Sequence, residues 1–330
     1  MVISKTPLRI SFTGGGTDLP SFYRFNDYGA VVSTSIDSYI YVTVKEHSKL
    51  FIENIRLNYS DVELVDTIDE IKNPIIRECL RFTDIKNNLY ISTIADCPGS
   101  SGLGSSSAFC VGLLNALYRL KNIPVSSGRL AEEAAHIEID VLQRPIGKQD
   151  HYATAFGGLN YFRFNSDESV TIIPISLEKN NIRTIFPNML SFWTTVTRPA
   201  ESILEQQDKR NHQNKEMLLK MRSQADAMQL ALLKDELTLE RFGEIIHDGW
   251  VMKRLLAPGI TNSAIDNCYE TARSLGAFGG KISGAGGGGF LNLFAPPEDH
   301  KALIQELSNK SLVPYKFNTD SLGTTVTKIY

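Results

Sequence analysis

The sequence predicts an α+β protein of two lobes, with strands concentrated in its first half and helices in its second. Segments rich in Val, Ile, Tyr and Thr indicate strands at 2–12 and 29–47. From about residue 199 a long span has the apolar spacing of helices instead. We expect an N-terminal lobe of residues 1–185 and a C-terminal lobe of residues 186–330.

The remaining elements follow from the same two periodicities. Alternating residues indicate strands, and apolar residues spaced three and four apart indicate helices. In chain order, we expect a strand at 88–97, helices at 108–121 and 126–142, strands at 157–164, 170–175 and 186–197, and helices broken near Glu236 and at Pro258. No repeat of fixed period interrupts this order.

Composition narrows the class of protein. The chain has 330 residues, of which 42% are hydrophobic and 22% charged, as in an ordinary globular protein. Its net charge of -3 and its lack of Lys/Arg runs argue against nucleic acid or a membrane surface as partners. Four cysteines without CxxC spacing indicate reduced thiols, not a zinc site or a disulfide framework. We therefore expect a cytoplasmic protein with small-molecule partners, and we leave a homodimer open.

A turn dense in glycine and serine, PGSSGLGSSSA at 98–108, separates the expected strand at 88–97 from the helix at 108–121. A helix N-terminus has unpaired N–H groups and partial positive charge, so it suits phosphate. Glycines let the backbone approach such an anion closely. The three serines at 105–107 could cap the helix, bind phosphate or hold Mg²⁺. A serine-capped turn without a ligand is the alternative.

Two further glycine clusters accompany this turn. KISGAGGGGFLNLF, at 281–294, matches G-x-G-x-x-G at 284–289, but the glycines lead into a strand-like FLNLF and not into a helix. We therefore expect a glycine hairpin that could bring backbone N–H groups near a ligand. The other cluster, TPLRISFTGGGTDLP at 6–20, places Arg9 in a strand and Asp18 after a tight turn.

In this order, the three clusters resemble the GHMP kinases, a superfamily of small-molecule kinases. The residues that match its phosphate-binding signature, P-x-x-x-G-L-x-S-S-A or near it, are Pro98, Gly102, Leu103, Gly104, Ser105 and Ser106. The resemblance covers nearly the whole chain. It implies the two-lobed GHMP kinase fold, an active site in the cleft between the lobes, and a reaction that uses ATP and Mg²⁺.

Within the superfamily, GGGTDLP and PIGKQDHYATAFGGLNYF (145–162) resemble the D-glycero-D-manno-heptose 7-phosphate kinases. That resemblance implies transfer of phosphate from ATP to the anomeric hydroxyl of a heptose 7-phosphate, giving the 1,7-bisphosphate. Galactose is disfavoured, because Gly15 and Gly16 stand where galactokinases carry a Glu-His pair. The alternatives are a fucokinase-like enzyme, a galactokinase-like sensor without phosphotransfer, and an NAD-dependent oxidoreductase that uses 284–289.

The resemblance also implies roles for single residues. Asp150 is the expected base or orienting group, Arg9 the cation that steadies the developing charge, and Ser106 and Glu138 the Mg²⁺ ligands. The expected ATP-binding residues are Pro98, Gly99, Ser100, Ser101, Gly102, Leu103, Gly104, Ser105, Ser106, Ser107, Gly286 and Gly287. The expected sugar-binding residues are Arg9, Thr17, Asp18, Lys148, His151 and Arg198.

Two further interpretations rest on local sequence. Arg198, at the expected lobe junction, is the leading candidate for the sugar's own phosphate, because a guanidinium can bind phosphate with two parallel hydrogen bonds. A surface arginine that begins a loop is the alternative. His136 lies between apolar residues, which favours a core histidine over a ligand.

Overall fold

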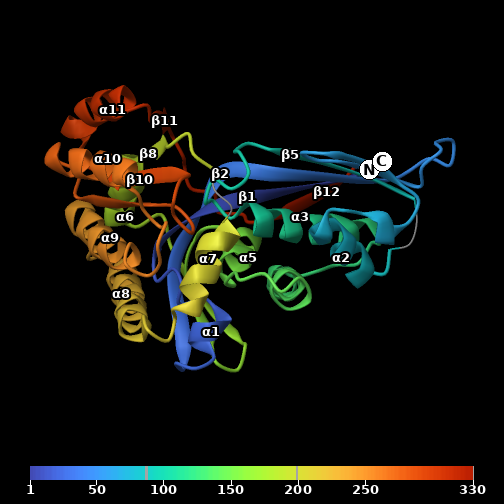
Figure 1. Ribbon diagram of the computed structural model, residues 1–330, viewed down its shortest axis with the longest axis horizontal. Helices are drawn as coiled ribbons and strands as arrows, with labels where there is room; N and C mark the ends of the chain where they lie inside the picture. The colour runs from blue at the N-terminus through green and yellow to red at the C-terminus, as the bar shows by residue number, and fades with distance from the viewer. Residues whose placement is uncertain (86–87, 198–199, 330) are drawn as a thin grey trace.

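The computed structural model describes residues 1–85, 88–197 and 200–329, and its strands form two sheets in two lobes (Figure 1). Within these residues the larger sheet has eight strands. Six are ordered β12-β1-β2-β5-β3-β4, β6 pairs with β2, and β7 pairs with β6. The smaller sheet has four, ordered β11-β8-β10-β9. The predicted α+β class is confirmed.

The elements of the larger lobe run from β1 to α5, with two later strands and one strand near the C-terminus. Its strands are β1 (Val2–Thr13), β2 (Tyr28–Glu46), β3 (Ile55–Asn58), β4 (Val62–Val65), β5 (Leu89–Ala95), β6 (Leu159–Asn165), β7 (Val170–Ile175) and β12 (Thr325–Lys328). Its helices are α1 (Pro20–Tyr23), α2 (Pro74–Phe82), α3 (Ser105–Leu120), α4 (Ser127–Ala135), the π-helix His136–Val141 and α5 (Gln149–Phe156).

The smaller lobe is richer in helix. Its strands are β8 (Met189–Trp193), β9 (Gly279–Ile282), β10 (Phe290–Phe294) and β11 (Val313–Tyr315). Its helices are α6 (Asn180–Ile185), α7 (Ala200–Lys209), α8 (Lys215–Lys234), α9 (Leu239–Lys253), α10 (Ser263–Ser274) and α11 (His300–Asn309), and 3-10 turns lie at Ile68–Glu70, Phe186–Asn188 and Pro297–Asp299. In Figure 1, α7 lies between the two lobes.

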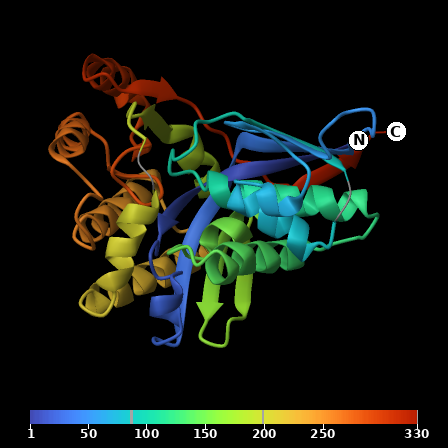
Figure 2. The same cartoon turned by 45° about the vertical axis from the view of Figure 1, so that its right-hand side comes forward.

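The long strand β2 organises the larger sheet. One edge of β2 pairs with β1 from Val44, opposite Val2, to Val32, opposite Thr13. Its other edge pairs with β6 over 28–34 and with β5 over 40–46. Figure 2 shows the β6–β7 hairpin beside one end of β2. The strand that carries Arg9, β1, is therefore held by the most extensively paired strand of this sheet.

Apolar helices cover one face of that sheet. Helix α3 buries twelve residues, from Ser107 to Tyr118, against β1, β2 and the neighbouring helices. A helix that is apolar nearly all round belongs in a core, as its sequence indicates. A second core around Trp250 and Tyr269 lies in the smaller lobe. The packing of α3 fixes its N-terminus, and with it the position of the serine-rich turn.

The structure departs from three sequence predictions. The helix expected over 126–142 ends at Ala135 and continues as a π-helix, and the strand expected over 186–197 is only Met189–Trp193. His136, expected in the core, is exposed and contacts Asp140, since the π-helix turns it outward. The lobe boundary between 185 and 186 stays a prediction, and β12, near the C-terminus, joins the larger sheet.

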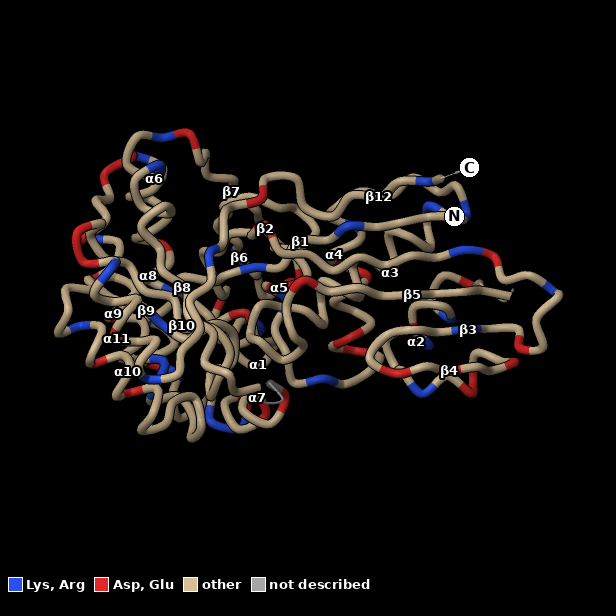
Figure 3. The backbone as a smooth tube through the Cα atoms, turned by 90° about the horizontal axis from the view of Figure 1, so that it is seen from above, with Lys and Arg blue, Asp and Glu red and all other residues tan. Residues whose placement is uncertain are grey.

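Charged residues of both signs are interspersed along the backbone of the two lobes (Figure 3). Among the described residues, no helix combines the length and the apolar character that crossing a membrane requires.

Candidate active site

Between the lobes lies a cavity of about 370 Å³ that parts of all three glycine clusters line. From the larger lobe it is lined by Arg9, Gly16, Asp18, Leu19, Ser100, Gly102, Gly104, Ser105, Ser106, Ser107, Arg144, Ile146, Gly147, Gln149 and Asp150. From the smaller lobe it is lined by Glu201, Leu204, Gln207, Lys253, Gly284 and Ala285. Segments far apart in sequence therefore meet here.

A bidentate ion pair joins Arg9 and Asp150 in this cavity. Arg9 Nε donates to Asp150 Oδ1 at 2.7 Å, and Nη2 donates to Oδ2 at 2.6 Å. Arg9 Nη1 also donates to the carbonyl of Gly102 at 2.6 Å. The side chain of Arg9 is 4% exposed and that of Asp150 22%. A fork of two parallel hydrogen bonds fixes the orientation of the carboxylate, which keeps an open side toward the cavity.

The helix α3 begins directly beside this pair. Gly104, its N-cap residue, has a φ of 77°, in the left-handed region that glycine adopts without cost. A Cβ at Gly104 would lie 3.3 Å from Cγ of Arg9 and 3.3 Å from Oδ2 of Asp150. Glycine therefore brings the N–H groups of the first helical turn next to Asp150, where an anion would be bound.

The two glycine-rich turns pack backbone against backbone. A Cβ at Gly102 would lie only 2.4 Å from the carbonyl oxygen of Ser283, and one at Gly284 only 2.6 Å from Cα of Gly102. The glycines after Gly284 lead into β10 and not into a helix. The predicted hairpin is therefore confirmed, and the dinucleotide motif lacks the helix that it needs.

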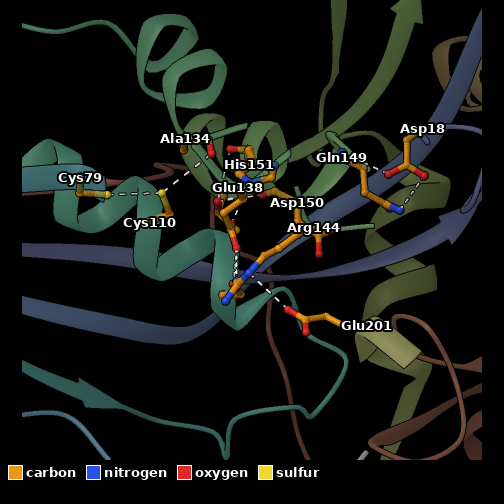
Figure 4. A network of polar contacts seen from close by, with 12 residues as sticks. Asp18, Cys79, Cys110, Ala134, Glu138, Arg144, Gln149, Asp150, His151 and Glu201 are labelled. Atoms are coloured by element: carbon orange, nitrogen blue, oxygen red, sulfur yellow. Dashed lines mark hydrogen bonds and ion pairs between the residues drawn. The ribbon is translucent and has the colours of Figure 1, made fainter. Parts of the chain in front are cut away.

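Three side chains surround Glu138 behind the serine-rich turn, and Figure 4 shows Glu138 with Arg144 and His151. Ser106 Oγ donates to Glu138 Oε1, and Arg144 Nη1 donates to both, at 2.7 and 2.6 Å. His151 Nε2 lies 2.9 Å from Glu138 Oε2. Burial alone would raise the pKa of Glu138, but His151, the Ser106 hydroxyl and the Arg144 charge together lower it to about 2. Glu138 is therefore a buried carboxylate.

The oxygen atoms of Ser106 and Glu138 fit the chemistry of a magnesium site. Mg²⁺ prefers oxygen ligands and usually takes only one or two from the protein. The two residues predicted as ligands are in contact, although Arg144 also binds both. In the described residues, no group of three His, Cys, Asp or Glu side chains is arranged to hold a metal. The donor set is therefore sufficient only with ligands from nucleotide and water.

Asp18, on the turn after β1, also lines the cavity. Its carboxylate accepts from the Gly16 N–H at 2.9 Å and from Gln149 Nε2 at 3.1 Å. A Cβ at Gly147 would lie 2.0 Å from Asp18 Oδ2, so the loop can pass only with glycine there. Burial and the charge of Asp150 raise the pKa of Asp18. A carboxylate with fixed neighbours suits recognition of sugar hydroxyls.

Three predicted sugar-binding residues do not line the cavity. The Thr17 hydroxyl is buried and bonded to the carbonyls of Gly14 and Ala30, so it supports the turn. Lys148 Nζ pairs with Glu168 at 2.5 Å. His151 has no exposed side-chain surface and contacts Glu138. The three assignments stay predictions, and in this structure each polar group is bound to the protein outside the cavity.

Several predicted ATP-binding residues also lie off the cavity wall. Pro98 and Gly99 are exposed beyond the turn, whereas Ser101 and Leu103 are buried beneath it. Gly286 and Gly287 pack on Ile260, whose carbonyl accepts from the Gly287 N–H at 2.8 Å. Arg198, the candidate for the sugar phosphate, lies outside the described residues.

Other cavity residues had no distinctive sequence signal. Arg144 and Lys253 are single cations in ordinary loop and helix sequence. Gln149 lies beside Asp150 in the quoted motif, but an uncharged amide gives no prior reason to be selected. Glu201 and Gln207 lie on α7, whose sequence is typical of a solvated helix. The position of α7 at the cavity depends on how the smaller lobe packs on the larger one.

Comparison with known proteins defines the family of this chain. The family model for the N-terminal domain of GHMP kinases matches residues 64–158, and the family model for their C-terminal domain matches residues 228–311. The chain belongs to the GHMP kinases, and it is an ATP-dependent sugar kinase with the fold of that family.

Particular relatives are similar over nearly the whole chain. The D-glycero-alpha-D-manno-heptose 7-phosphate kinase of Campylobacter jejuni is 29% identical over 319 residues, 92% of each chain. The bifunctional fucokinase/GDP-fucose pyrophosphorylase of Arabidopsis thaliana is 24% identical over 92% of this chain, which spans only 31% of that protein. The crystal structure of a D-glycero-D-manno-heptose 1-phosphate kinase from Bacteroides thetaiotaomicron superposes with a TM-score of 0.81, at 24% identity and full coverage of both chains. At that identity the superposition supports the fold.

Proposed function

We propose that this kinase transfers the γ-phosphoryl group of ATP to the anomeric hydroxyl of D-glycero-D-manno-heptose 7-phosphate, giving the 1,7-bisphosphate. The observation that carries the proposal is the Asp150 carboxylate, held by Arg9 beside the N-terminus of α3 and open to the cavity. The choice of sugar is supported by the similarity to the Campylobacter jejuni heptose 7-phosphate kinase.

In the proposed reaction, Asp150, Arg9 and Asp18 have separate roles. Asp150 orients the sugar hydroxyl and takes its proton as the oxygen attacks the γ-phosphorus and the bond to ADP breaks. Arg9 holds Asp150 in place and offers positive charge to the transferred group. The N–H groups at the start of α3 bind the phosphates of ATP. Asp18, which also lines the cavity, accepts hydrogen bonds from sugar hydroxyls.

Ser106 and Glu138 would hold Mg²⁺. When bound, the metal neutralises negative charge on the β- and γ-phosphates. Arg144, which donates to both Ser106 and Glu138, would place a positive charge beside the phosphates.

A fucokinase-like acceptor is the second candidate, supported by the similarity to the Arabidopsis thaliana protein. A screen of ATP consumption with heptose 7-phosphate, fucose, mannose, galactose and mevalonate decides between them. We expect turnover with heptose 7-phosphate. Turnover with fucose alone would replace the proposed substrate. Stabilisation by sugar and Mg-ATP without any turnover would identify a sensor.

A further inference from the structure

A buried lysine from the smaller lobe faces the cavity without a carboxylate partner. Lys253, the last residue of α9, is 6% exposed and lines the cavity. Its Nζ donates to the carbonyl of Gly284 at 2.6 Å. An ammonium group has three N–H donors. None of the ion pairs among the described residues includes Lys253, so two donors lack a charged acceptor.

The neighbours of Lys253 place it among groups of the larger lobe. A Cβ at Gly15 would lie 3.5 Å from Lys253 Nζ and 3.9 Å from Gln149 Nε2. That Gln149 nitrogen in turn donates to Asp18. The side chains of Lys253, Gln149 and Asp18 thus lie close together at the turn after β1. They offer both donors and acceptors to whatever occupies the adjoining cavity.

The charges around Lys253 favour a hydroxyl ligand over a triphosphate. Asp18 on the turn after β1 and Asp150 on α5 act on Lys253 as negative charges, while Arg9 on β1 and Lys281 on β9 are the nearby cations. A polyphosphate would be repelled by two carboxylates. A polyol, in contrast, can donate to the carboxylates and accept from the ammonium group. Burial of an ammonium group without such acceptors is costly.

We propose that Lys253 is a sugar-binding residue, whose free N–H groups donate to hydroxyl oxygens of the acceptor while Asp18 accepts from the neighbouring hydroxyls. The inference rests on the proposed sugar kinase function. It adds a contact from the smaller lobe to the sugar acceptor. The acceptor is thereby held from both sides of the cavity.

Kinetics of Lys253→Met test this assignment. Methionine keeps the length of the side chain and removes its charge and donors. We expect kcat/KM for the sugar to fall about 10- to 100-fold, the scale for losing hydrogen bonds to a charged group, with KM for ATP nearly unchanged. Lys121→Met is the matched control, because Lys121 Nζ also donates to a backbone carbonyl, that of Thr83, outside the cavity.

Two results would overturn the proposal. Unchanged sugar kinetics in a folded Lys253→Met protein would show that the ammonium group does not bind the acceptor. Equal losses for sugar and ATP would show that Lys253 only supports the Gly284 turn.

The pH dependence gives a second measurement if Lys253→Met does not fold. Burial is the main reason that the pKa of Lys253 is lowered to about 8, with Arg9 lowering it and Asp18 and Asp150 raising it. The ammonium form is present below that pH, so KM for the sugar should rise as pH passes about 8. Lys253→Arg should remove this rise, because arginine stays charged. A rise retained in Lys253→Arg would contradict the proposal.

Failure of the proposed function is recognised separately. The wild-type enzyme is first screened with the five acceptors, and the sugar that it phosphorylates becomes the probe. Turnover of a different sugar replaces the proposed substrate and leaves the Lys253 test intact. Absence of both turnover and calorimetric binding with every sugar would overturn both.

Discussion

Replacement of Asp150 by asparagine separates catalysis from structure at the centre of the cavity. Asparagine keeps the side-chain shape and removes the charge that two Arg9 nitrogens contact at 2.7 and 2.6 Å. Loss of an acid/base group lowers turnover by about two to four orders of magnitude, and we expect Asp150→Asn to do so. The affinity for ATP should stay near that of the wild type, because the first turn of α3 is unchanged.

The same change should lower the free energy of unfolding. Removing one partner of a buried ion pair costs about 3–5 kcal/mol. Arg9 keeps its bond to the Gly102 carbonyl, and the asparagine oxygen still accepts one N–H. Asp150 is also 22% exposed, so water offsets part of the loss. We therefore expect a decrease of about 1.5–3 kcal/mol, the range for hydrogen bonds to charged groups.

The assay combines initial rates at saturating sugar and Mg-ATP with urea unfolding and calorimetric titration of ATP. Asp140→Asn is the matched control, because Asp140 is 49% exposed and pairs with the exposed His136. Such surface pairs contribute at most about 1 kcal/mol. A loss of turnover below about tenfold in Asp150→Asn would refute its assignment as base. Unchanged stability would refute the importance of the Arg9 pair.

Three further predictions follow from the same cavity. Gly104→Val should raise KM for ATP about tenfold or more, because β-branched side chains are strained at a φ of 77° and the new Cβ presses on the Arg9–Asp150 pair. Gly99→Val is the control, because a Cβ there meets open space and KM for ATP should not change. Equal KM values for ATP in the two variants would refute a phosphate-binding turn. Lys148→Met should leave KM for the sugar within about twofold, since its partner is Glu168, and a large increase would support Lys148 as a sugar contact instead. Glu138→Gln should raise the Mg²⁺ concentration for half-maximal rate at least about tenfold, and an unchanged Mg²⁺ titration would exclude Glu138 as a ligand.

The backbone of the cavity was predictable because glycine and serine patterns are local. Gly104 must lie at a turn that precedes an apolar helix, and the strand-like FLNLF excludes a helix after Gly284. The roles predicted for Arg9 and Asp18 come from the resemblance that the three glycine clusters carry together. Such signals depend on neighbours in the chain, so the sequence alone carries them.

The side chains that depend on packing between the lobes were not predictable. Lys253 faces the cavity only because α9 packs where it does, and nothing in GWVMKRLL distinguishes it from the lysine of an exposed helix end. His151 follows the predicted Asp150 directly, yet the helix directs it to Glu138 and away from the cavity. A π-helix at residues 136–141 changes the direction in which successive side chains point, so the prediction that His136 lies in the core was wrong. The direction of each of these side chains is decided by tertiary contacts, which the sequence pattern does not give.

The double pairing of β2 has a consequence for the order in which the protein opens. Amide hydrogens at 32–34 and 40–44 are enclosed between two neighbouring strands, so their exchange with solvent deuterium requires separation of the sheet. The edge strands β4 and β7 exchange after smaller openings. Because β1 is bonded along this protected strand, Arg9 belongs to the last unit to unfold. Lys253, on α9, reaches the same cavity from a separate unit, so local opening of the smaller lobe can release its side of the cavity while the Arg9–Asp150 pair stays assembled.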